Sequence, residues 1–123
     1  MVRNIGEISI LGQIWTIKEC TKMSDDKLFS KGECSGYSSY SSREIMVLAL
    51  DSDYYLEGDF GCPENDRKRV LRHEIVHSFL SESGLQASAG AYSGSWAENE
   101  AMVDWIAIQL PKIVEACKAA GCM

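Results

Sequence analysis

The sequence predicts an α+β domain, with a β-sheet formed by the first half of the chain and helices in the second half. Short segments rich in β-branched and aromatic residues precede residue 51 and favour strands. Two longer segments after residue 62 have the apolar spacing and the end signals of helices. The length of 123 residues suits one hydrophobic core, so we expect residues 1–123 to form a single domain.

The first strands are predicted at residues 7–11 and 13–20, joined by a turn at Gly12. In the second segment Trp15 and Ile17 alternate with more polar residues and therefore share one face. Gly12 supplies the backbone freedom that a tight turn needs. This pattern predicts a β-hairpin.

The next part of the chain contains one clear strand. Residues 35–42 are mostly Ser and Tyr and suit either a loop or a polar edge strand. Residues 43–50 carry apolar side chains at both alternating sets of positions, which predicts a strand covered on both faces or a strand in a crowded core. Residues 51–61 are acidic and bounded by glycine, and we expect a loop there.

A long helix is predicted to begin at Pro63, a residue favoured in the first helical position. Glu64 and Asp66 place carboxylates in the first turn, where the helix dipole favours them, and Gly84 is a typical stop signal. The apolar stripe expected to face the core consists of Val70, Ile75, Val76, Phe79 and Leu80. Residues 86–94 are small and polar, which predicts a loop.

A second helix is predicted from Trp96, because Ser95 to Glu98 matches a capping box in which Glu98 returns to the helix start. Pro111 should kink or end this helix near Gln109, and a short last helix should follow up to about residue 120. Its large apolar residues are expected in the core: Trp96, Met102, Trp105, Ile106 and Leu110.

The composition limits the classes of partner and compartment. With 12 basic and 18 acidic side chains the net charge is −6, which disfavours nucleic acid as a partner. The N-terminus lacks a basic stretch followed by an apolar run, and the longest apolar run, 45–50, is too short for a bilayer. Five scattered cysteines suit a reducing compartment, although a Cys117–Cys122 disulfide stays open. We therefore expect a cytoplasmic protein with no membrane partner.

The chemical signal lies at residues 73–77, which read His-Glu-x-x-His within the long predicted helix. His73 and His77 are four residues apart, so their imidazoles project from one face and can bind one tetrahedral cation. Glu74 lies beside the open coordination position and can take a proton from a metal-bound water. Two surface histidines can produce this spacing by chance. These are, however, the only histidines in the chain, and they occur in a suitable helix.

A catalytic zinc ion needs a third protein ligand, and the second helix offers one. Glu100 and Asp104 are four residues apart and share a face. We expect Glu100 to bind the metal and Asp104 to accept the outer N–H of a ligand histidine, which fixes the tautomer of that ring. The alternative for both residues is a solvated acidic face.

The pattern His73-Glu74-x-x-His77 followed by Asn99-Glu100-x-x-x-Asp104 resembles that of the gluzincins, the thermolysin-type zinc peptidases. Residues 71–85 and 96–109 resemble short phage- and prophage-type metallopeptidase-like proteins, which are distant relatives of the ImmA/IrrE group. This resemblance implies a zincin-like fold, in which a small mixed sheet packs on the HExxH helix and a C-terminal helix carries the third ligand.

The resemblance also implies how a substrate binds. In zincins an edge strand above the metal pairs with an extended peptide, and residues 36–40 are our candidate, with Gly36 and Tyr37 as substrate-binding positions. Zincins usually add a side chain that stabilises the oxyanion. Tyr92, Tyr37 and Arg43 are the unranked candidates for that role.

We therefore expect a zinc-dependent metallopeptidase acting on a peptide or protein, with Zn²⁺ held by His73, His77 and Glu100 and with Glu74 as the base. One alternative is a catalytically weak or inactive zinc-binding regulatory protein of a phage or mobile element. A third reading makes zinc a structural staple. It is less favoured because structural sites normally have four protein ligands.

Overall fold

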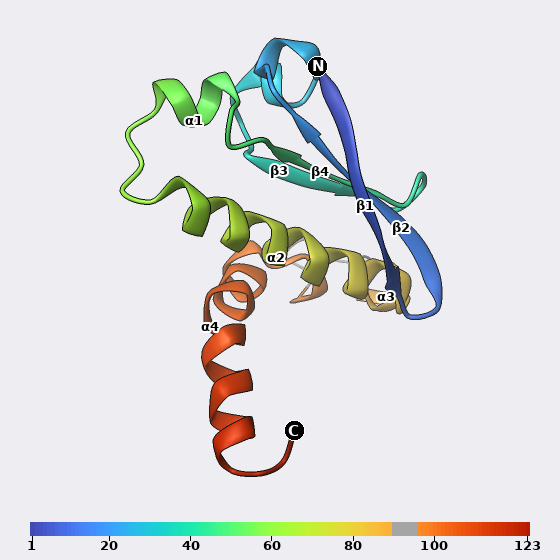
Figure 1. The fold of residues 1–123 in the computed structure, drawn as a ribbon. Helices are drawn as coiled ribbons and strands as arrows, with labels where there is room; N and C mark the ends of the chain where they lie inside the picture. Colours follow the sequence, from blue (N-terminus) through green and yellow to red (C-terminus); the bar gives the residue numbers. More distant parts are fainter. Residues whose placement is uncertain (90–95) are drawn as a thin grey trace.

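The computed structural model describes residues 1–89 and 96–123, and it is an α+β structure. A four-stranded mixed sheet packs on one side of the long helix α2 (Pro63–Glu82), and helix α4 (Glu100–Ala119) packs on the other side (Figure 1). The described residues thus form three successive layers, with α2 in the middle. Helix α2 therefore has one side that faces the sheet and another that faces α4.

The sheet has the order β1-β2-β4-β3. Strands β1 (Val2–Ile10) and β2 (Gln13–Cys20) form the predicted antiparallel hairpin, and β1 begins five residues before the predicted start. β2 pairs in parallel with β4 (Glu44–Leu48), which pairs antiparallel with β3 (Gly36–Ser39). Of the two readings of residues 35–42, the structure therefore shows the polar edge strand.

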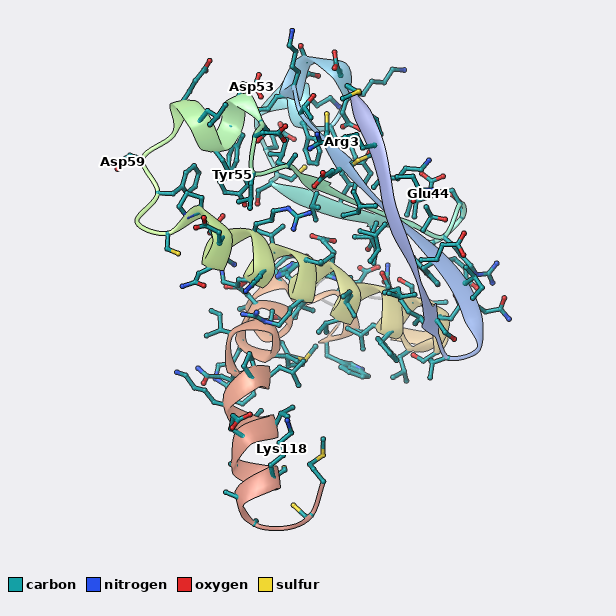
Figure 2. The ribbon with its side chains drawn as sticks, in the orientation of Figure 1. Arg3, Glu44, Asp53, Tyr55, Asp59 and Lys118 are labelled. Carbon is teal, nitrogen blue, oxygen red and sulfur yellow. The ribbon has the colours of Figure 1, made fainter. Side chains whose placement is uncertain are left out.

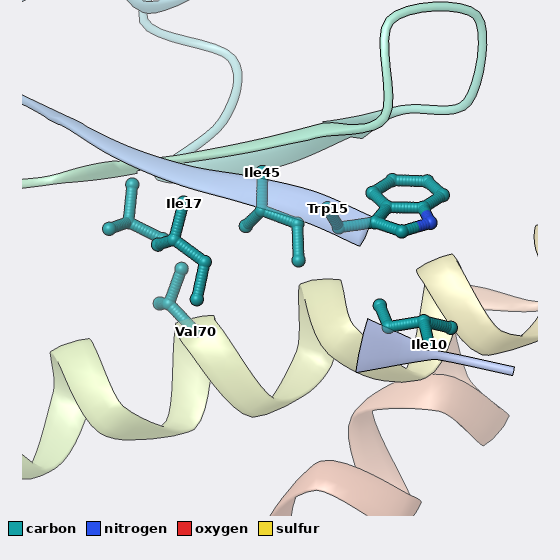
Figure 3. Close-up of a cluster of buried hydrophobic side chains, with 6 residues drawn as sticks. Ile10, Trp15, Ile17, Ile45 and Val70 are labelled. Atoms are coloured by element: carbon teal, nitrogen blue, oxygen red, sulfur yellow. The ribbon is translucent and has the colours of Figure 1, made fainter. Parts of the chain in front are cut away.

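Strand β4 is covered on both faces, as its sequence predicts. On the face toward α2, Ile45 and Val47 join a cluster with side chains of β1, β2 and α2: Ile10, Trp15, Ile17 and Val70 (Figure 3). On the opposite face, Met46 and Leu48 pack with Cys20, Phe29 and Tyr55. Two hydrophobic clusters thus hold β4 in place, and β3 is positioned against α2 through its pairing with β4.

The prediction of a loop at residues 51–61 is wrong in part, because α1 (Asp53–Glu57) lies there. Ser52 is the N-cap, and its hydroxyl accepts a hydrogen bond from the backbone N–H of Tyr55 at 3.4 Å. Tyr55 lies between α1 and the sheet (Figure 2). The cap and this one buried ring stabilise a five-residue helix that has too few residues for a periodic signal.

Helix α2 begins at Pro63 as predicted, but its predicted apolar stripe is wrong in part. Its buried residues are Val70, Glu74 and Ser78, which are four residues apart, whereas Phe79 is 42% exposed. The sheet covers only this narrow face. Gly84 follows with a positive φ of 83°, and α3 (Leu85–Ala89) then occupies the start of the loop predicted at residues 86–94. Residues 90–94 of that loop lie outside the described ranges.

Helix α4 begins at Glu100, four residues after the predicted start. Asn99 is the N-cap, and its side chain accepts a hydrogen bond from the backbone N–H of Met102 at 2.8 Å. Trp96–Glu98 forms a separate 3₁₀ turn, η3. Ser95, the first residue of the predicted capping box, lies outside the described residues. The Asn99 cap places Glu100 in the first helical turn.

Of the two effects predicted for Pro111, a kink or an end of the helix, the end and the separate last helix are wrong, because α4 continues through Pro111 to Ala119. A proline at position 111 has no N–H for the carbonyl of Ala107. The Nε–H of Arg72 donates to that carbonyl at 2.6 Å instead. A side chain of α2 therefore replaces the hydrogen bond that Pro111 removes.

The expectation that the large apolar residues of α4 form core is also largely wrong. The buried residues of α4 are Val103 and Ala107, while Trp105 is 58% exposed and Trp96 and Leu110 are also exposed. Met102 and Ile106 are half-buried. The reason is geometric: only the first half of α4 lies against α2, and the end that carries Lys118 projects away from the sheet (Figures 1 and 2).

Across residues 1–89 and 96–123, the structure has no helix with both the length and the apolar character needed to span a bilayer.

All five cysteines are free thiols. Cys122 donates a hydrogen bond from its thiol to the carbonyl of Cys117 at 3.3 Å, so this pair is linked without a disulfide. Cys20 is buried in the second hydrophobic cluster, and burial is the main cause that raises the pKa of its thiol. None of the five belongs to the cluster of metal-binding side chains described below.

Candidate metal centre

Three predicted ligands meet where α2 faces the first turn of α4. His73 and His77 project from one side of α2, and Glu100 approaches them from α4. The Nε2 atoms of the two histidines are 3.1 Å apart. Glu100 Oε2 lies 3.0 Å from His73 Nε2, and Glu100 Oε1 lies 2.8 Å from His77 Nε2. The ligand atoms of the group all lie within 4.8 Å of one another, so it can hold a metal ion.

The close approach of these atoms requires either protons or a cation between them. Asp104 Oδ1 lies 3.3 Å from His73 Nδ1, and a carboxylate can only accept, so Nδ1 carries the hydrogen. The Nε2 atom of a neutral His73 then has only a lone pair, which faces the second imidazole and the Glu100 carboxylate. Either additional protons or a metal ion must offset the repulsion between these electron-rich atoms.

The donor spacing fits a small tetrahedral cation. Zinc binds histidine nitrogen at about 2.0 to 2.1 Å, which places two ligand atoms roughly 3.3 Å apart in a tetrahedron. The observed Nε2–Nε2 separation of the two histidines, 3.1 Å, is slightly shorter, and each of these nitrogens has a different Glu100 oxygen at 2.8 or 3.0 Å. The pKa of His77 is lowered, mainly because the ring is buried. The nearby His73 also lowers this pKa, whereas the negative charge of Glu100 raises it. A lowered pKa favours the neutral imidazole, which is the form that binds metal.

Asp104 lies where the sequence places it, beside the outer nitrogen of His73. It is also paired with Arg69 of α2, because Arg69 Nη1 lies 2.7 Å from the same Asp104 oxygen. Asp104 is thus not a member of the three-ligand group but a neighbour of one ligand. Its contact with Nδ1 leaves the other ring nitrogen of His73, Nε2, beside Glu100 and His77.

Glu74 is a buried carboxylate directly beside the ligands. It is 6% exposed and lies on the side of α2 that faces the sheet. Burial raises the pKa of Glu74 to about 7, and the charge of Glu100 acts in the same direction. A hydrogen bond with the side chain of Ser38 opposes this shift. Near neutral pH the carboxylate can therefore both take up and release a proton.

An open hollow connects the cluster with the edge strand β3. It has a volume of roughly 400 Å³, and its walls include Gly36, Tyr37, Glu74, His77 and Glu100. A β-carbon at Gly36 would lie only 2.6 Å from Val70 Cγ1 of α2. Glycine therefore allows β3 to approach α2 closely. The two predicted substrate-binding positions, Gly36 and Tyr37, thus line the same hollow as the predicted base.

Two of the three oxyanion candidates are already bonded elsewhere. The Tyr37 hydroxyl donates to Asp26 at 2.6 Å, and burial followed by this hydrogen bond raises the pKa of Tyr37. Arg43 forms an ion pair with the buried carboxylate of Glu82 at 3.1 Å. Tyr92, the third candidate, lies outside the described residues. Neither Tyr37 nor Arg43 directs a free donor at the cluster.

Sequence reasoning missed two residues that contact the functional side chains, namely Arg69 and Ser38. Arg69 precedes His73 by four residues and therefore shares its helix face, which is a signal that could have identified it. Ser38 reaches Glu74 from the sheet. No local pattern links residues 38 and 74, because their contact depends on how β3 packs against α2.

Comparison with known proteins adds no relative. No protein-family model, no curated protein and no solved structure matches the chain. The assignment of chemistry therefore depends on the geometry of the cluster and its surroundings.

Proposed function

We propose that the protein is a zinc-dependent peptidase whose ion is held by His73, His77 and Glu100. One observation carries the proposal: the three donors converge beside the buried carboxylate of Glu74, at the wall of a hollow bounded by an edge strand. The His73-Glu74-x-x-His77 and Asn99-Glu100-x-x-x-Asp104 pattern supports a zincin-like, gluzincin-type assignment, distantly related to the ImmA/IrrE group. We also propose that the protein is related to the short metallopeptidase-like proteins of phages and prophages.

A zinc ion at this site would polarise a scissile carbonyl and lower the pKa of a coordinated water to near 7. The protein itself provides the group that transfers the proton. Glu74 accepts a proton from the attacking water and later delivers it to the leaving amine. Burial raises the pKa of Glu74 to about 7 in the metal-free protein, and the positive charge of a bound ion would lower that pKa and so favour the carboxylate that accepts the proton.

The edge strand supplies a surface for an extended peptide. β3 is the last strand of the sheet, and it pairs with β4 along only one of its edges. A peptide can add to the other edge through backbone hydrogen bonds. Gly36 and Tyr37 are the positions of β3 that we assign to this contact, since both line the hollow beside Glu74.

Glu74→Gln tests the proposed base directly. The variant should retain zinc with near wild-type affinity, because Glu74 is not one of the three ligands. Cleavage of a peptide library by the zinc-loaded variant, followed by mass spectrometry, should fall by about 10²- to 10⁴-fold. Glu115→Gln, which changes an exposed carboxylate of α4, is the matched control and should cleave like wild type. Normal cleavage by Glu74→Gln would show that Glu74 is not the base.

A second candidate function is a zinc-binding interaction protein without useful turnover. The observation in its favour is that Tyr37 and Arg43, two candidates for stabilising the oxyanion, are bonded to Asp26 and Glu82. In this case, zinc-loaded wild type would leave the library intact. Glu74→Gln would still bind the protein partner as tightly as wild type does.

A further inference from the structure

Arg69 joins two carboxylates through the two arms of its guanidinium group. Nη1 lies 2.7 Å from Asp104 Oδ1, and Nη2 lies 3.2 Å from Asp66 Oδ1. Asp66 is on the same helix, three residues earlier, whereas Asp104 is on α4. The guanidinium thus bridges the two helices directly beside the ligand His73.

The same Asp104 oxygen accepts from both Arg69 and His73. His73 Nδ1 lies 3.3 Å from Asp104 Oδ1, the atom that Arg69 contacts. On its other side Asp66 accepts a hydrogen bond from the Tyr55 hydroxyl at 2.9 Å. A continuous chain of contacts therefore runs from Tyr55, in the second hydrophobic cluster, through Asp66, Arg69 and Asp104 to His73.

Asp104 needs this restraint because its side chain is 39% exposed. A free carboxylate one turn from Glu100 on the same helix face could rotate toward a bound cation and compete with the intended ligand. A planar guanidinium with fixed donors can hold two carboxylates in one geometry, which a lysine ammonium does less well. Arg69 therefore constrains the position of Asp104.

We propose that Arg69 is a positioning residue for the metal centre, which acts through Asp104 to hold His73 with Nε2 directed at the ion. Arg69 itself does not belong to the ligand group. The proposal rests on the metal site of the proposed function but not on peptide hydrolysis. It predicts that the loss of metal affinity on removing Arg69 and the loss on removing the Asp104 carboxylate are not additive.

The test is a double-mutant cycle in zinc affinity, measured by adding zinc to the metal-free full chain in competition with a chromophoric chelator. Arg69→Met and Asp104→Asn should each weaken zinc binding by about 10- to 100-fold, as expected for groups that orient a ligand. The double variant should bind zinc about as well as Asp104→Asn alone. Arg69→Lys should retain part of the affinity, because an ammonium can reach one carboxylate.

Arg67→Met is the matched control, since Arg67 lies on the same helix but pairs with Glu19 of β2 at 2.8 Å. It should leave zinc affinity unchanged. Wild-type affinity in Arg69→Met, or losses that multiply in the double variant, would overturn the inference while leaving the metal site intact. Absence of zinc binding by wild type would overturn both the metal site and this inference. Should Arg69→Met fail to fold, Arg69→Lys decides, and wild-type affinity in that variant counts against the inference.

Discussion

At the scale of single residues, Glu74 is the side chain least expected from folding alone. It occupies the α2 face that packs against the sheet, between the buried positions Val70 and Ser78. An apolar residue there would add buried hydrocarbon, whereas a buried carboxylate costs free energy unless it is compensated. Residues that lower stability in this way are concentrated at functional sites.

The buried carboxylate of Glu74 should make the stability of the metal-free protein depend on pH. Because the pKa of Glu74 rises from 4.5 to about 7 on folding, the folded state holds the proton more tightly than the unfolded state. The stability linked to this proton is present in full below pH 4.5 and is lost as the pH rises through 7. The loss reaches about 3 kcal/mol at most.

Glu74→Gln should remove this dependence, because an amide does not titrate in this range. Chemical unfolding in the presence of a chelator, compared between pH 5 and pH 8, should show wild type losing more stability than the variant. Glu115→Gln should follow wild type, since that side chain is exposed. Parallel pH profiles for wild type and Glu74→Gln would mean that folding does not raise the pKa of Glu74.

At the scale of elements, the continuity of α4 past Pro111 depends on a side chain from another helix. Arg72 of α2 donates to the Ala107 carbonyl, which lacks its usual partner because Pro111 has no N–H. Arg72→Met should therefore destabilise the protein by about 1 to 2 kcal/mol, since it leaves the carbonyl of the buried residue Ala107 unpaired. Denaturant unfolding measures this change.

A double-mutant cycle tests this explanation by comparing the effect of Arg72→Met on stability in the wild-type and Pro111→Ala backgrounds. Alanine restores the backbone N–H that can bond the Ala107 carbonyl, so Arg72→Met should cost clearly less in that background. Lys112→Met, which removes an exposed cation from α4, should have little effect in either background. Equal costs of Arg72→Met with and without Pro111 would contradict the explanation.

The elements with strong local signals are those that the sequence predicts correctly. The hairpin at Gly12, the strand at residues 43–50 and the helix from Pro63 all have such signals, and the structure contains each of them. Helix α1 and the uninterrupted α4 were missed because they depend on tertiary contacts, the burial of Tyr55 and the hydrogen bond from Arg72.

The residues of the candidate site also divide into those that a local sequence pattern predicts and those that depend on tertiary contacts. The ligand spacing of His73, His77 and Glu100 can be read along two helices, because side chains four residues apart share a face. The structure brings these three together and places Asp104 beside His73. The pairing of Ser38 with Glu74 connects elements that are far apart in the sequence, and no local pattern reports it. For Arg69 the sequence shows only the helix face shared with His73, whereas its pairing with Asp104 depends on the packing of α4 against α2.

At the scale of the whole molecule, the middle position of α2 explains how one helix serves both the fold and the site. Its Val70 side packs against the sheet, while His73 and His77 meet Glu100 of α4. A metal ion shared by the two helices would add a further link to the Arg69–Asp104 ion pair, the Arg72–Ala107 hydrogen bond and the buried Val103 and Ala107 side chains of α4. Binding to the folded state alone must then raise its stability.

The most direct test of the metal centre is calorimetric titration of zinc into the metal-free full chain, with thermal unfolding of the same samples. We expect one zinc ion per chain, and a stability gain of about 2.7 kcal/mol at a free zinc concentration 100 times the dissociation constant. His77→Ala and Glu100→Ala should lose this binding and this gain. Glu98→Ala, which removes a nearby acid outside the ligand group, should keep both. Absence of zinc binding by wild type, or undiminished binding by Glu100→Ala, would contradict the three-ligand centre.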